Sequence, residues 1–97
     1  MKRLAKDNLN TGSEYDRIFL ERQKKGVDWF DLKRWKELIK YIPKKGVLFD
    51  LGCLDSLVIP LAKKKYPELW CTGIDISETA IDSMNDNYGW AGEYIIG

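Results

Sequence analysis

The first half of the sequence has apolar residues at the spacing of α-helices. Apolar side chains at three- and four-residue steps predict a first helix over residues 14–25 and a second helix that begins after Asp28 and ends at Pro43. Asp28 is of a residue type that caps helix N-termini. We expect the apolar stripe of the second helix to pack into a core, and this stripe consists of Trp29, Leu32, Trp35, Leu38, Ile39 and Ile42.

The second half of the sequence instead has short uncharged runs that alternate with helices. Residues 47–49 and 69–74 are uncharged and mostly apolar, which is typical of parallel strands buried on both faces. A helix is expected over about 56–66 and another after Ser77, which can cap it. A third strand is expected over 93–96.

This order of elements predicts an α/β fold. Helices followed by a β-α-β-α-β unit are typical of a Rossmann-like three-layer fold with parallel strands, here in truncated form. Ninety-seven residues make one small domain at most. We therefore interpret residues 1–97 as a single partial domain, with a helical segment over 1–45 and the β-α-β-α-β half over 46–97. Trp70, in the second strand, is expected to lie in the core.

Charge is distributed unevenly along the chain. All sixteen lysines and arginines precede residue 66, whereas the remainder contains acidic residues and no basic one. A basic segment can indicate a nucleic-acid partner. The lysines, however, follow the faces of the predicted helices, as solvated side chains do. The pattern therefore favours a solvated surface over a nucleic-acid site.

Several classes of chemistry are excluded by composition. The sequence contains no histidine, which excludes acid–base catalysis by imidazole and the common zinc sites. Both cysteines lie in apolar segments, so we expect unpaired core thiols in a reducing compartment. No apolar run approaches the roughly 20 residues of a membrane span, and no apolar signal region follows the N-terminus. We expect a cytoplasmic protein with no metal site and no membrane partner.

The candidate chemistry lies where the first two predicted strands end. The turn after the first strand contains Gly52, but Leu54 stands where a dinucleotide-binding turn has its second glycine, and no basic residue replaces the lost phosphate contacts. A pyrophosphate cofactor is therefore disfavoured. Asp75, at the end of the second strand, can accept hydrogen bonds from both hydroxyls of a ribose. The residues around the turn include acidic side chains and no basic one, and this suits a nucleoside ligand that carries a positive charge.

These segments resemble a known family. The run VLFDLGCLDS at 47–56, followed by TGIDISETAID at 72–82, is similar to the cofactor-binding half of the class I S-adenosylmethionine-dependent methyltransferases. The resemblance covers residues 28–97 and, more loosely, the segment before them. It implies that S-adenosylmethionine is the cofactor. The family usually has glycine at the position of Leu54.

The resemblance also implies a role for individual residues. Asp50 and Gly52 would line the methionine end of the cofactor, and Cys53 would contribute its backbone. Asp75 would bind the ribose hydroxyls, and Ile76 would pack on the adenine. The aromatic side chains that resemble a segment closing over the site in many relatives are Tyr15, Phe19 and Trp29.

We therefore expect the S-adenosylmethionine-binding portion of a class I methyltransferase, inactive alone, with the methyl acceptor and the catalytic residues unknown. A non-catalytic nucleoside-binding protein and a self-associating Rossmann-like module stay open as alternatives. In the family the strand order is 3-2-1-4, and this chain has no fourth strand to pair with the first. An open sheet edge recruits partners, so we expect a homo-oligomer through this edge.

Overall fold

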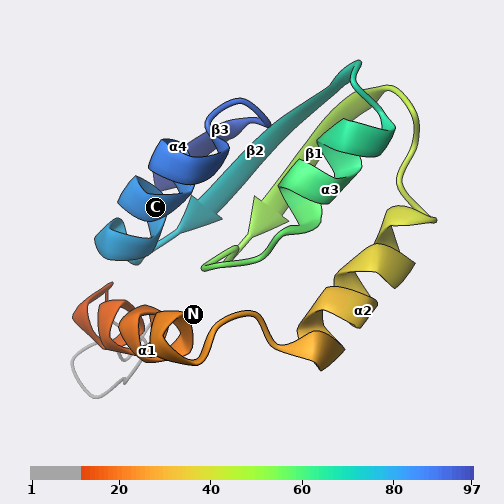
Figure 1. The fold of residues 1–97 in the computed structure, drawn as a ribbon. Coiled ribbons are helices and arrows are strands. Elements are labelled where there is room, and N and C mark those ends of the chain that lie inside the picture. The colour runs from red at the N-terminus through yellow and green to blue at the C-terminus, as the bar shows by residue number, and fades with distance from the viewer. Residues whose placement is uncertain (1–11) are drawn as a thin grey trace, which may run out of the picture.

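The computed structural model describes residues 12–97. Two helices come first, and three strands and two helices then alternate, in the order predicted from the sequence (Figure 1). The elements are α1 (Gly12–Lys25), α2 (Trp29–Ile39), β1 (Gly46–Leu51), α3 (Val58–Lys65), β2 (Leu69–Asp75), α4 (Glu78–Tyr88) and β3 (Glu93–Ile96). None of the helices in this range is long and apolar enough to cross a membrane.

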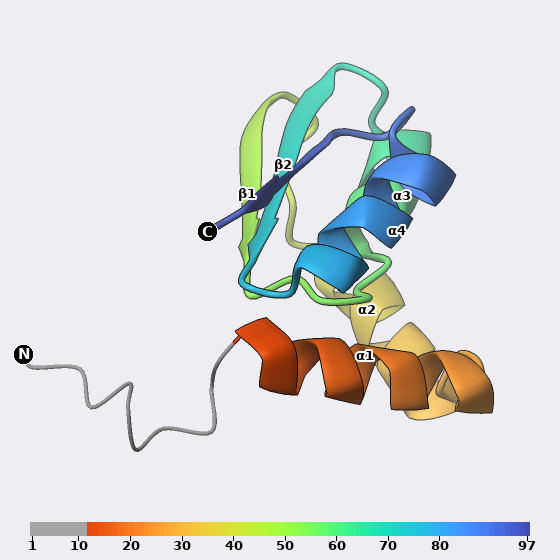
Figure 2. The ribbon, with the colours of Figure 1, turned by 90° about the vertical axis from the view of Figure 1, so that its left-hand side faces the viewer.

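The strands form one parallel sheet in the order β1-β2-β3. Asp50 of β1 lies beside Gly73 of β2, which in turn lies beside Tyr94 of β3. Both connecting helices, α3 and α4, lie on the same side of the sheet (Figure 2). This arrangement confirms the α/β, Rossmann-like architecture.

Local signals explain where the helices begin. The Asp28 carboxylate accepts a hydrogen bond from the Phe30 amide at 2.8 Å, so it caps α2 as predicted. The Ser77 hydroxyl accepts one from the Ala80 amide at 3.1 Å and caps α4. Pro60 lies in the first turn of α3, where its missing amide hydrogen costs least.

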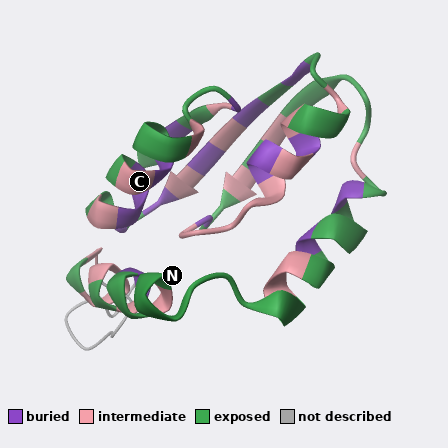
Figure 3. Ribbon diagram, viewed as in Figure 1, coloured by how far each residue is buried: buried purple, intermediate pink, exposed green. Residues whose placement is uncertain are grey.

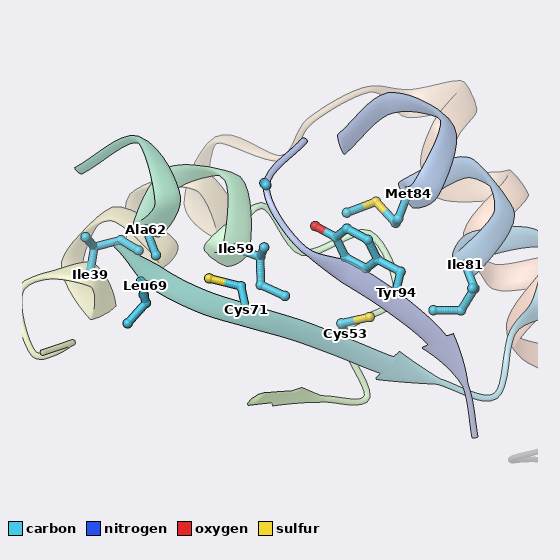
Figure 4. Packing of buried hydrophobic residues seen from close by; sticks show 10 residues of the cluster. Ile39, Cys53, Ile59, Ala62, Leu69, Cys71, Ile81, Met84 and Tyr94 are labelled. Carbon is cyan, nitrogen blue, oxygen red and sulfur yellow. The ribbon is translucent and has the colours of Figure 1, made fainter. Parts of the chain in front are cut away.

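The core lies between the sheet and its two covering helices. Its buried residues include the two predicted core cysteines and are Ile39, Cys53, Ile59, Ala62, Leu69, Cys71, Ile81, Met84, Ala91 and Tyr94 (Figure 4). The Tyr94 ring packs tightly over Gly73. A Cβ at Gly73 would come within 2.7 Å of the ring and 3.0 Å of the Cys53 sulfur. Position 73 therefore has no room for a side chain.

The helix α1 lies beyond the carboxyl ends of the strands (Figures 1 and 2). Asp16 holds it to α4, because its carboxylate accepts hydrogen bonds from the Ser77 hydroxyl at 2.5 Å and the Thr79 amide at 3.0 Å. Arg22 holds it to the turn after β1 and to α2, through ion pairs of 2.7 Å with Asp55 and with Asp31. These contacts fix α1 next to the edge where the two strand-to-helix turns meet.

The prediction that the first two strands are buried on both faces is wrong. No residue of β1 is buried (Figure 3). Trp70 of β2, predicted to lie in the core, is 76% exposed. The reason is that α3 and α4 cover the same face, and no helix within residues 12–97 covers the other.

The apolar stripe of α2 is also narrower than predicted. Trp35 and Ile39 are buried, whereas Trp29 is 63% exposed and Leu38 is 48% exposed. The helix ends at Ile39 rather than continuing to Pro43. Only one side of this short helix packs on the rest of the chain, so Trp29, at its first residue, contacts solvent.

Candidate functional site

A hollow of about 430 Å³ opens at the carboxyl edge of the sheet. It lies among α1, the turn between β1 and α3, and the turn between β2 and α4. Four of the predicted site residues line it, and the full lining is Tyr15, Leu51, Gly52, Leu54, Ile74, Asp75, Ile76 and Gly97. Residues far apart in the sequence therefore meet where the sequence placed the candidate chemistry.

The turn after β1 folds back onto the end of β2. The amides of Gly52 and Cys53 both donate to the Ile74 carbonyl, at 2.7 and 3.0 Å. Gly52 has φ +70° and Leu54 has φ +41°, both in the left-handed region. A Cβ built on Gly52 would meet nothing within 4 Å, so the space in front of this residue is open to a ligand.

Asp75 joins the two turns. It is only 6% exposed, and its two carboxylate oxygens accept hydrogen bonds from the amides of Leu54 at 3.1 Å and Ser77 at 2.9 Å. Each carboxylate oxygen has two acceptor sites, and the two amides use one site on each oxygen. The sequence predicted the position of this residue but not its structural role in holding both turns.

Asp50 lies beneath the turn, on the helix-covered face of the sheet, and does not line the hollow. Its Oδ2 is buried without a hydrogen-bond partner among the described residues. Burial raises the pKa of this carboxyl; a hydrogen bond from Ser56 opposes the rise and the nearby Asp75 carboxylate adds to it. An unpaired buried oxygen is costly, which marks Asp50 as a group that a hydrogen-bond donor would stabilise.

Cys53 also lies beneath the turn rather than in the hollow. It is 3% exposed, and burial raises the pKa of its thiol to about 12. The thiol is therefore neutral near pH 7 and is not a nucleophile. Its amide donates a hydrogen bond to the Ile74 carbonyl. Its own carbonyl accepts a hydrogen bond from the Ser56 amide at 2.7 Å.

The three aromatic residues predicted to close over the site do not come together. Tyr15 of α1 lines the hollow. Phe19 is buried, 3% exposed. Trp29 lies on α2 and lines none of this hollow.

Sequence reasoning missed Asp16 and Arg22, which position α1, because their partners on α4 and after β1 are distant in the sequence.

Comparison with known proteins supports the fold. No known protein family matches the chain in sequence, and no curated protein matches it. Among solved structures, the crystal structure of the MccD protein is similar, with a TM-score of 0.54 and 26% sequence identity. The match covers 71% of this chain and 32% of MccD, so the chain corresponds to about a third of that protein. The Rossmann-like architecture is thus shared with a solved structure.

Proposed function

We propose that this chain binds S-adenosylmethionine in the hollow at the carboxyl edge, as the cofactor-binding portion of a class I methyltransferase-like domain. The observation that carries the proposal is that Gly52, Asp75 and Ile76 line one hollow at the ends of two adjacent parallel strands. Open α/β sheets bind nucleotides and nucleosides in this position. The likeness to MccD supports the fold on which this placement rests.

The hollow fits a nucleoside better than a nucleotide. Its volume lies within the range of small-molecule pockets, about 300–1,000 Å³. No lysine or arginine among residues 12–97 lines it, so no side chain in this part of the chain would neutralise a phosphate there. Asp75 offers acceptors for ribose hydroxyls, and Ile76, 38% exposed, offers an apolar surface for a base.

The electrostatics favour a cationic ligand. Asp75 lines the hollow and Asp50 lies beneath its floor. Burial is the main cause of the raised pKa of Asp50, and repulsion by the Asp75 carboxylate adds to it. A positive charge nearby would relieve this repulsion. S-adenosylmethionine supplies a methyl group on a positively charged sulfur. This chain's residues bind and orient the adenosine part, and Gly52 leaves room for the remainder.

The second candidate is a protein that binds a nucleoside without transferring a methyl group. It uses the same hollow and the same residues. We assign binding, not turnover, to the lining residues. A labelled-methyl transfer assay with protein, nucleic-acid and small-molecule acceptors should therefore transfer no label for either candidate, and robust transfer would contradict both.

Isothermal titration calorimetry tests the binding proposal. We expect heat of binding with S-adenosylmethionine and S-adenosylhomocysteine and much less with ATP. Ile76→Lys puts a cation into the hollow at an exposed position and should weaken S-adenosylmethionine binding at least ten-fold. Leu20→Lys is the matched control, because Leu20 is 51% exposed and lines no part of the hollow. Absence of binding to the wild type, or equal affinity in both variants, would contradict the proposal.

A further inference from the structure

The sheet face opposite α3 and α4 is not covered by any other element of residues 12–97 (Figure 2). Side chains alternate between faces along a strand, and paired residues of neighbouring strands share a face. Val47 pairs with Trp70, and Leu51 with Ile74, which pairs with Ile95. Phe49 pairs with Thr72, which pairs with Glu93. The open sheet face therefore has two polar residues, Thr72 and Glu93, and its apolar residues are Val47, Phe49, Leu51, Trp70, Ile74 and Ile95.

We propose that the open sheet face is an interface at which a second copy of this chain packs face to face. Its side chains are large and well exposed: Trp70 is 76% exposed, Leu51 74%, and Phe49 61%. Side chains of this size and exposure present on the order of 600 Å² of apolar surface, at the upper end of the patches that monomers carry. A stable interface buries roughly 800 Å² on each partner, so the open sheet face supplies most of the area that one partner needs.

The composition of the open sheet face favours a second copy of this chain over other partners. It has no lysine or arginine, which an acidic lipid surface or a nucleic acid would require. Its one charged residue, Glu93, lies on the edge strand β3, at the margin of the face. A two-fold interface uses the same patch on both copies, and two sheets pack by burying apolar side chains between them.

Face packing differs from the pairing of sheet edges. Within the described residues β1 pairs only with β2, so its other edge is open. Pairing of two β1 edges would extend the sheet and leave Trp70 in solvent. Packing of two open sheet faces would bury Trp70, which lies one strand in from that edge.

Sedimentation velocity over a wide concentration range tests the interface. We expect a dimer of the wild-type chain and a dissociation constant at least a hundred-fold weaker for Phe49→Lys. Phe30→Lys is the matched control, because Phe30 is 73% exposed on α2, away from the sheet, and should dimerise like the wild type. Circular dichroism verifies that both variants are folded. A monodisperse wild-type monomer at high concentration, or equal dimerisation of both variants, overturns the proposal.

Tryptophan fluorescence tells which surface is buried. Association should shift the emission of the wild type to shorter wavelength and protect it from acrylamide, and Trp70→Phe should abolish this change. Trp29→Phe is the control and should retain it, because Trp29 lies on α2. A dimer whose Trp70 emission does not respond to association would overturn face packing in favour of edge pairing.

Discussion

Leu54 has a backbone conformation that suits glycine, and this gives a sharp test of the turn. Its φ of +41° lies in the left-handed region, which costs a residue with a Cβ roughly 1–2 kcal/mol. In ordinary positions alanine is more stable than glycine by about 0.5–1 kcal/mol, because glycine loses more chain entropy on folding. At position 54 the first effect exceeds the second. We therefore expect Leu54→Gly to be more stable than Leu54→Ala by about 0.5–1 kcal/mol.

Comparison of these two variants isolates the effect of the backbone conformation on stability. Both lose the half-buried leucine side chain, which contributes about 1 kcal/mol for a side chain of this type and burial. Leu54→Gly should therefore lie within about 1 kcal/mol of the wild type, since relief of strain offsets the lost packing. Urea unfolding followed by circular dichroism measures the free energies. If Leu54→Ala proves the more stable variant, the left-handed turn is not the native conformation.

The other predictions address the core, the position of α1 and pH. Gly73→Ala should destabilise the fold by about 1–3 kcal/mol in urea, because its Cβ would overlap the Tyr94 ring, and an unchanged midpoint would refute this packing. Arg22→Met should increase hydrogen exchange in α1, because it removes both ion pairs that hold this helix. Arg34 lies outside α1, so Arg34→Met should leave the exchange of α1 unchanged. The Ser77 hydroxyl and the Thr79 amide lower the pKa of Asp16. A lowered pKa adds stability that is present above the ordinary aspartate pKa of about 3.9 and is lost as pH falls through the folded value. Acid should therefore release α1 from α4 in an NMR titration, and this step should be missing in Asp16→Asn.

The elements could be predicted because their signals are local. Asp28 and Ser77 cap helices through amides two or three residues away, and Pro60 fits a first turn wherever the helix packs. The positions of some candidate site residues at the ends of β1 and β2 could also be predicted, since parallel strands end at a common edge. For that reason Gly52 and Asp75 were predicted near each other and line one hollow.

The rest depends on contacts that no local pattern encodes. An apolar run indicates a strand but not how many of its faces are covered, so Trp70 was predicted to be buried and is exposed. The contact between Asp16 and Ser77 joins residues 61 positions apart. The use of both Asp75 oxygens by backbone amides depends on two turns that meet only in the folded chain.

The hollow and the open sheet face are adjacent, because Leu51 and Ile74 belong to both. A second copy packed on the face would add a wall beside the hollow, and ligands bind best when most of their surface is buried. Coupling of this kind is reciprocal, so ligand should also favour the dimer. We expect the affinity for S-adenosylhomocysteine to rise with protein concentration in the wild type and to be constant in Phe49→Lys, whose side chain lines no part of the hollow. Calorimetry at two protein concentrations measures both. An affinity that falls as the dimer forms would mean that the second copy closes the hollow instead of completing it.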